Sequence, residues 1–202
     1  MRRQIVDHGL IAEVVAPRLW EHPKTIDGGY TANDAAERRY AVERSKRAGD
    51  FAAEMGCNLM LLRLTREGAY VREPKDIDKS TGYLLEAVYA TPEYDKILRI
   101  AVEPKPSEPM DLAYIPTMGH AVPLGYRSNE PACVGVLMES AHSILAGLDP
   151  ADEVGFATAA GKLWSVHLND QNWPKYDRDR SFASVDLPMA LNQARVLDEN
   201  RF

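Results

Sequence analysis

The sequence predicts an α/β protein, folded as one domain over residues 1–202, in which parallel strands alternate with helices. Short segments that are apolar throughout, such as residues 57–62 and 132–138, have the composition of strands covered on both faces. Longer segments of helical period, such as residues 35–55, separate them. Polar residues follow the ends of several strands, and because such ends converge on one face of a barrel, we expect a barrel rather than an open sheet.

The elements follow one another in a regular order. Residues 1–9 end a helix that Gly9 closes, and residues 10–16 form a short apolar strand. A loop rich in aromatic and glycine residues comes next, and Asn33 or Asp34 caps the helix at 35–55. The remaining elements are expected as a strand at 57–62, a loop at 63–75, a helix at 76–89, a strand at 99–103, a helix at 117–127, a strand at 132–138, a helix at 150–160, a strand at 161–168 and a helix at 186–200. The chain therefore contains at least five strands, each followed by a helix.

Composition excludes several classes of function. The net charge of −6 gives no basic surface for a phosphate backbone, so we expect no nucleic-acid partner. The two cysteines, Cys57 and Cys133, lie inside apolar segments and suggest neither a disulfide framework nor a thiolate metal cluster. No apolar run is long enough for a membrane span and the N-terminus has no signal-type pattern, so we expect a cytoplasmic protein with no membrane partner.

A carboxylate and an ammonium lie two residues apart at the end of one predicted strand. Glu103 and Lys105 follow the apolar run at 97–101, and prolines on either side of Lys105 make a rigid, extended exit. Such a segment aims its side chains at a common point. The alternative is a proline-rich turn with a surface ion pair.

Potential metal ligands gather after two later strands. Glu139 and His142 stand three residues apart at a strand end, His167 ends the next strand, and Asp177 and Asp179 alternate in an extended segment that puts both on one face. Taken singly, these residues could be a helix-start carboxylate, a surface histidine and a solvated charge run. Together they match the oxygen-rich sites that Mg²⁺, Mn²⁺ or Co²⁺ prefer, and two ions bridged by Glu139 would offset the repulsion among the carboxylates.

The sequence resembles the xylose isomerases, in the shorter form found in actinobacteria. The matching stretches run in the family's order and are His22-Pro23 through Asp27-Gly28-Gly29-Tyr30-Thr31-Ala32-Asn33-Asp34, Arg66-Glu67-Gly68-Ala69, Val102-Glu103-Pro104-Lys105-Pro106-Ser107-Glu108-Pro109, Glu139 with His142 and Ala146-Gly147, and Lys175-Tyr176-Asp177-Arg178-Asp179. The resemblance implies a (β/α)₈ TIM barrel, a homo-oligomer (dimer or tetramer) and two divalent ions. It also implies a metal-assisted hydride shift that interconverts an aldose and its ketose.

The resemblance also assigns roles to the metal ligands. It implies that Glu103 and Glu139 hold the first ion. Glu139, His142, Asp177 and Asp179 would hold the second.

Further roles concern the sugar. Lys105 and Asp177 would be catalytic, with Lys105 donating to the sugar carbonyl oxygen. Trp20 takes the place of a family phenylalanine that walls the sugar pocket, and His22 lies beside it in the sequence as a second candidate substrate contact.

Two residues depart from the family pattern. His167 stands where xylose isomerases carry an aspartate ligand, as in the related rhamnose isomerases, so it is a candidate ligand that changes the charge of the site. Arg63 stands where they carry a tryptophan beside the substrate, so it is a candidate substrate contact that alters specificity.

The chain also matches only part of the family's length. Residue 1 falls in the second helix and residue 202 just before the eighth strand, so we expect an incomplete barrel of five or six strand–helix units. The ring-opening His-Asp pair and the last-strand aspartate would then be missing. A catalytically incomplete remnant that binds metal or sugar is the main alternative. Zinc-dependent abasic-site endonucleases use a related barrel, but the acidic balance disfavours that function.

Overall fold

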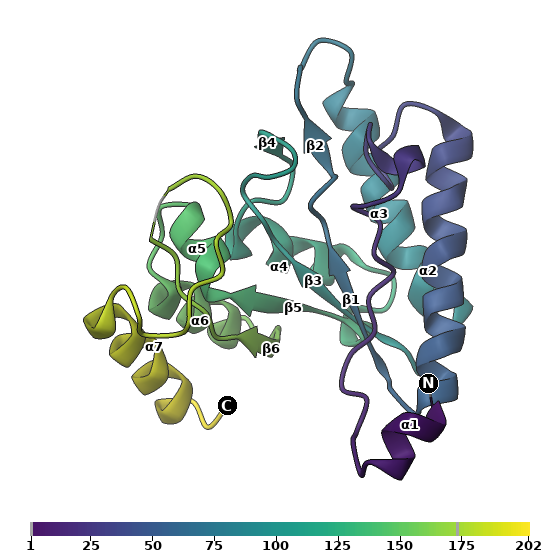
Figure 1. The fold of residues 1–202 in the computed structure, drawn as a ribbon. Helices are drawn as coiled ribbons and strands as arrows, with labels where there is room; N and C mark the ends of the chain where they lie inside the picture. The colour runs from purple at the N-terminus through teal and green to yellow at the C-terminus, as the bar shows by residue number, and fades with distance from the viewer. Residues whose placement is uncertain (1, 173) are drawn as a thin grey trace.

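The computed structural model describes residues 2–172 and 174–202. Its centre is a four-stranded sheet in the order β1-β3-β5-β6 with every pairing parallel (Figure 1). The strands are β1 (Leu59–Arg63), β3 (Arg99–Glu103), β5 (Val134–Glu139) and β6 (Leu163–His167). Each strand lies beside the next parallel strand of the chain, which is the order of a (β/α)₈ barrel wall. The predicted α/β class is confirmed.

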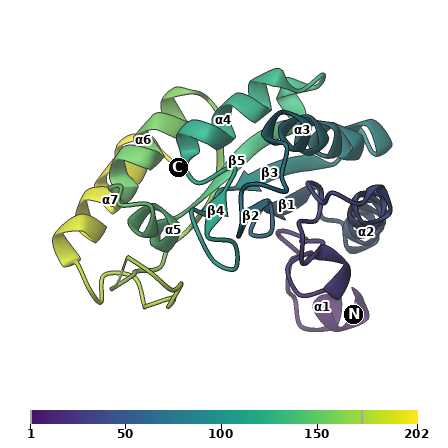
Figure 2. The ribbon, with the colours of Figure 1, turned by 90° about the horizontal axis from the view of Figure 1, so that it is seen from above.

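The helices are α1 (Arg2–Asp7), α2 (Ala35–Met55), α3 (Ile77–Tyr94), α4 (Met118–Arg127), α5 (Ser140–Leu145), α6 (Pro150–Ala159) and α7 (Leu187–Glu199), with 3-10 turns at Pro23–Thr25 and Pro131–Cys133. Of these, α2, α3, α4 and α6 pack against the strands on the outer face of the wall. Figure 2 shows α3, α4 and α6 along one face of the curved sheet. No helix in the described part of the chain is long and apolar enough to cross a bilayer.

The boundaries of the longest helices follow local chemistry. Asp34 begins α2, since its Oδ1 accepts a hydrogen bond from the amide of Ala36 at 2.6 Å. Gly56 ends the helix in the left-handed conformation, at φ 74°. Helix α3 continues to Tyr94, beyond the predicted end at residue 89, although Pro92 lies inside it. Pro92 is buried, so packing at this position outweighs the lost backbone hydrogen bond.

The two faces of the sheet have different cores. On β1, Met60 and Leu62 belong to the large core beneath the helices. The alternate residue Leu61 joins Ala101 and Leu137 in a separate small cluster on the inner face. Because side chains alternate along a strand, the last residues of β1, β3 and β5 share this inner face.

The predicted strand at 10–16 is wrong in extent. The segment runs beside β1 but pairs with it only at Val15, whose amide donates to the Leu59 oxygen at 3.1 Å and whose oxygen accepts from Leu61. Leu10 is 62% and Ile11 91% exposed, so the first half of the segment has no partner among the described residues that would hold it extended. The sheet therefore has four full strands and one single-bridge neighbour at the β1 edge.

A second, two-stranded sheet was not predicted. Gly68–Ala69 (β2) pairs antiparallel with Leu112–Ala113 (β4), inside segments expected to be loops. Next to it, Glu67 is buried and fastens the loop before α2: its Oε1 accepts from the amides of Gly29 and Tyr30 at 3.1 and 3.0 Å. Its Oε2 accepts from the amide and hydroxyl of Thr31 at 2.9 and 2.7 Å.

Replacing Glu67 by glutamine is expected to lower the free energy of unfolding by about 2 to 3 kcal/mol, because an amide NH₂ would face backbone donors and leave at least one unsatisfied. Thermal or urea unfolding would measure the change. Glu73→Gln, at an exposed position between β2 and α3, is the matched control and should change stability by less than about 0.5 kcal/mol. Equal stability of the two variants would show that the hydrogen bonds of Glu67 contribute little.

Candidate metal centre

Four titratable side chains end the strands on the inner face. Arg63, Glu103, Glu139 and His167 are the last residues of β1, β3, β5 and β6, and the sheet register pairs Arg63 with Glu103 and Glu139 with His167. Each follows an inner-face residue by two positions, so strand alternation alone directs them to the same side. Polar groups from four strands therefore meet at the carboxyl edge of the wall, as the sequence predicts.

His142 enters the same space from α5, the short helix that starts directly after β5. Its Nδ1 lies 3.1 Å from the carbonyl oxygen of Pro104, which can only accept, so Nδ1 carries the proton. Its Nε2 lies 3.1 Å from Arg63 Nη2 and 3.2 Å from Glu139 Oε1. Histidines that ligate metals commonly have one ring nitrogen hydrogen-bonded to a carbonyl oxygen and the other facing the ion, and the buried ring of His142 fits this pattern.

The loop after β6 adds the remaining carboxylates. Asp177 Oδ2 lies 2.7 Å from Lys105 Nζ and 3.5 Å from His142 Nε2. Asp179 lies further out, where its Oδ1 accepts from the side-chain amide of Asn169 at 2.8 Å. The two aspartates predicted to act together are therefore placed differently: Asp177 joins the cluster and Asp179 lies at its rim.

Two groups of side chains have the geometry to hold a metal ion. Glu103, Glu139 and His167 offer ligand atoms within 4.8 Å of one another, and so do Glu139, His142 and Asp177. Glu139 belongs to both groups.

Unpaired oxygens indicate that the cluster fits a cation. Oε2 of Glu103 and Oδ1 of Asp177 are buried and lack a hydrogen-bond partner among the described residues, whereas Oε1 of Glu103 is paired with Arg63 Nε at 3.0 Å. Burial raises the pKa of Glu103 well above its ordinary value; the charge of Arg63 opposes the rise and that of Glu139 adds to it. A divalent ion would satisfy these oxygens, since carboxylate and imidazole ligands suit Mg²⁺, Mn²⁺ or Co²⁺.

The other two carboxyl groups are ionised. Burial acts to raise the pKa of Glu139, but the hydrogen bond from His167 and the charge of His142 outweigh it and hold the pKa at about 2. Burial also opposes ionisation of Asp177, yet hydrogen bonds from His142 and Lys105 hold its pKa below the ordinary value. Both groups are therefore carboxylates at neutral pH.

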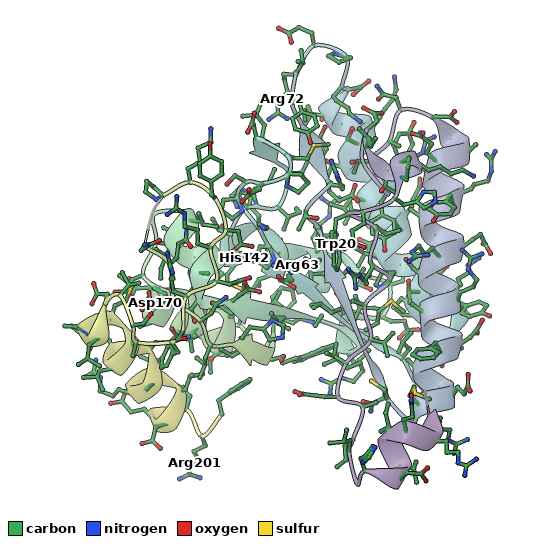
Figure 3. All side chains as sticks on the ribbon, viewed as in Figure 1. Trp20, Arg63, Arg72, His142, Asp170 and Arg201 are labelled. Carbon is green, nitrogen blue, oxygen red and sulfur yellow. The ribbon has the colours of Figure 1, made fainter. Side chains whose placement is uncertain are left out.

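Arg63 lies among the acidic groups rather than beside them. Its Nε is 3.0 Å from Glu103 Oε1, and its Nη2 is 3.7 Å from Glu139 Oε2 and 3.5 Å from Asp177 Oδ2. Figure 3 shows Arg63 between His142 and Trp20, and its guanidinium carbon is 5.8 Å from the centre of the Trp20 ring. The residue predicted to contact substrate thus also supplies a positive charge to the candidate ligands.

A cavity of about 340 Å³ opens beside the cluster. It is lined by Trp20, Arg63, Thr65, Arg66, Lys105, Glu108, Pro109, Asp177 and Asp179. This is the lower part of the size range of small-molecule sites. His22 is not among the described residues that line it: its ring packs on Tyr40 of α2, with ring centres 4.7 Å apart, and its Nδ1 accepts from the amide of Lys24.

Asn169, which the sequence places with His167 at the end of the same strand, donates to Glu139 Oε1 at 3.0 Å as well as to Asp179, and thereby connects the cluster to its rim. No role in the site was assigned to Thr65 or Arg66 from the sequence. Thr65 and Arg66 line the cavity two and three positions after Arg63. Their position after a strand end was the available signal, since residues just beyond the carboxyl ends of barrel strands line the mouth of the barrel.

Comparison with known proteins identifies the family. The family described as xylose isomerase-like TIM barrel matches residues 1–196, nearly the whole chain. The chain belongs to this family. The predicted fold, an incomplete (β/α)₈ TIM barrel, is confirmed, and so is the resemblance at the level of this broader family.

Solved structures share the fold at low sequence identity. The 3-keto-D-glucoside 4-epimerase YcjR of E. coli in its apo form is 13% identical, with a TM-score of 0.75 over 100% of this chain and 72% of the epimerase. A D-allulose 3-epimerase from Methylomonas sp. in complex with D-allulose is 16% identical, with a TM-score of 0.70 over 100% of this chain and 64% of that one. The IolI protein with a bound zinc atom is 14% identical, with a TM-score of 0.67 over 97% and 68% of the two chains.

Proposed function

We propose that this member of the xylose isomerase-like TIM barrel family is a metal-dependent sugar isomerase that interconverts an aldose and its ketose. One observation carries the proposal: two potential ligand groups share Glu139, and Lys105 lies beside them on the wall of a sugar-sized cavity. The similar structures of sugar epimerases, one of them with bound D-allulose, support a sugar as the substrate. The zinc-bound IolI protein supports a divalent ion in this fold.

The proposed ligand sets follow the two groups. Glu103, Glu139 and His167 would hold one ion, and Glu139, His142 and Asp177 the other, with Asp179 reaching the second from the rim. Mg²⁺, Mn²⁺ or Co²⁺ would suit these oxygen-rich sets. When bound, such ions polarise a substrate carbonyl and favour transfer of hydrogen between neighbouring carbons.

The side chains around the ligands supply positioning. Lys105 is 6% exposed and held by Asp177, so its ammonium is fixed at the cavity wall, where it would donate to the sugar carbonyl oxygen and offset developing negative charge. Trp20 would form the apolar wall against which the carbon face of the sugar packs. Asp177 is catalytic in this scheme because it both orients Lys105 and belongs to a ligand group.

The experiment is isomerisation of D-xylose by the purified chain with Mn²⁺ in D₂O, followed by NMR. A hydride shift transfers hydrogen within the substrate, so the ketose should form without deuterium at the carbon that receives it. Glu139→Gln prepared in the same way should give no ketose, which controls for isomerase from the expression host. Ketose carrying deuterium would indicate proton exchange instead, and no conversion of any aldose tested would favour the catalytically incomplete remnant.

A rhamnose-isomerase-like substrate is the second candidate. The observation that favours it is the position of His167 in the first ligand group, with Nδ1 3.4 Å from Glu139 Oε2. L-Rhamnose should therefore be assayed beside D-xylose, and the higher kcat/KM would decide between them. We also propose that the chain forms a homo-oligomer, a dimer or tetramer, which light scattering of the purified chain would test.

A further inference from the structure

The hydroxyl of Thr65 is an unexplained polar group beside the cavity. Thr65 is 7% exposed, its Oγ1 is shielded from solvent, and this atom has no hydrogen-bond partner among the described residues. Thr65 lines the cavity between Arg63 and Arg66 in the sequence. A buried hydroxyl costs free energy unless it has a hydrogen-bond partner. A polar group that enters the cavity beside Thr65 could supply that partner.

Arg66 is fixed at the same end of the cavity. Its Nε donates to the carbonyl oxygen of Trp20 at 3.0 Å, and its Nη1 donates to the hydroxyl of Tyr70 at 3.0 Å. These neutral acceptors orient the guanidinium without neutralising it. Its positive charge is thus available to an anionic group in the cavity.

Arg63 lies nearer the candidate metal ligands than a remote subsite requires. Its Nε is 3.0 Å from Glu103 Oε1 and its Nη2 is 3.5 Å from Asp177 Oδ2, so it is paired with these groups. Arg66 lines the same cavity and makes no ion pair with a carboxylate of the described residues. Arg66 is therefore the guanidinium that a charged group of the substrate would meet.

The carboxylates and the unpaired guanidinium of the cavity come from different segments. Asp177 and Asp179 lie in the loop after β6, whereas Arg66 lies in the loop after β1. Glu108 also lines the cavity, and its Oε2 accepts from the amide of Asp177 at 2.5 Å. A sugar whose reacting carbons lie beside Asp177 and Lys105 would present its other end to Arg66.

We propose that Thr65 and Arg66 form an anion subsite, and that the substrate is a sugar carrying a carboxylate or phosphate group at the end remote from the reacting carbons. The inference rests on the proposed function for the direction of the sugar in the cavity. The chemistry of the subsite is that of arginine binding to a planar or tetrahedral oxyanion, with the threonine hydroxyl as a further donor.

Calorimetric titration of the Mn²⁺-loaded chain with D-glucuronate, D-glucose 6-phosphate and D-glucose tests this subsite. At least one of the two anionic sugars should bind about tenfold or more tightly than glucose, which corresponds to the strength of one good charged hydrogen-bonded pair. Whichever binds more tightly identifies the anion as carboxylate or phosphate. Equal binding of all three sugars would overturn the proposal.

Two variants locate the preference. Arg66→Gln should reduce the ratio of anionic to neutral affinity about tenfold, and Thr65→Val severalfold, while glucose affinity changes less than twofold. Arg47→Gln, at an exposed position of α2, makes the same change in net charge and should leave the ratio unaltered. A ratio unchanged by Arg66→Gln, or reduced equally by Arg47→Gln, would show that the preference does not arise at this subsite. Melting temperatures would confirm that each variant is folded.

The measurement separates this inference from the proposed function. Binding is read at equilibrium, so a chain that converts no sugar can still show the anion preference and its dependence on Arg66. A chain that isomerises neutral sugars but binds anionic and neutral sugars equally would contradict the anion subsite and support the proposed isomerase function.

Discussion

Millimolar Mn²⁺ is expected to raise the melting temperature of this chain by about 5 to 10 °C, and Glu139→Gln should abolish that rise. A ligand at 100 times its dissociation constant stabilises the folded state by about 2.7 kcal/mol, and in a chain of this size each kcal/mol moves the melting temperature by about 2 to 4 °C. Glu139 belongs to both ligand groups, so its loss should impair both sites together. Differential scanning fluorimetry with and without EDTA would measure the effect.

The matched control for this experiment is Glu54→Gln on α2, which removes one exposed carboxylate far along the chain from the cluster. It should keep the full Mn²⁺-dependent rise. A variant lacking Glu139 that Mn²⁺ still stabilises as strongly as the wild type would contradict the assignment of the cluster as a metal centre. So would a wild-type chain that Mn²⁺, Mg²⁺ and Co²⁺ all fail to stabilise.

Lys105→Met is expected to lower kcat about 100- to 1,000-fold on whichever sugar the wild-type chain isomerises, the usual cost of removing one donor from a developing oxyanion. Methionine keeps most of the length of the side chain but neither its charge nor its hydrogen bond to Asp177. Initial rates over a range of sugar concentration would separate kcat from KM.

The Mn²⁺-dependent rise in melting temperature shows whether Lys105→Met loses activity through the missing ammonium or through damage to the metal centre. Lys105 is not in either ligand group, so Lys105→Met should retain the Mn²⁺-dependent rise in melting temperature. Lys96→Met, which changes an exposed lysine before β3, should retain both activity and metal response. Full activity in Lys105→Met, or loss of its metal response, would show that the ammonium does not act on the sugar.

The sequence was sufficient for the parts of the fold that local patterns determine. Apolar strands and capped helices were placed to within a few residues because burial on both faces and capping chemistry are encoded locally. The segment at 10–16 was overestimated because its apolar residues indicate a strand, whereas its length of pairing depends on which neighbours are present. Likewise, β2 and β4 form through pairing of two-residue segments that are 43 to 45 positions apart, a contact without a local signal.

The candidate site was also predictable only in part from the sequence. Strand ends and the Glu139–His142 spacing predicted which polar groups would gather, and the structure brings most of them together. The positions of Arg63 among the carboxylates and of His22 against Tyr40 could not be read from the sequence, because both depend on where side chains from separate elements meet. The rim position of Asp179 depends on Asn169 across the loop after β6, which is also a tertiary contact.

The position of Arg63 has a consequence for the order of folding and metal binding under the proposed function. A cluster of carboxylates with no counter-charge would oppose folding until ions bound, but here a guanidinium of the same chain lies 3.0 Å from Glu103. Folding would therefore not require metal. Loading of the proposed centre would then replace one internal cation by external ones.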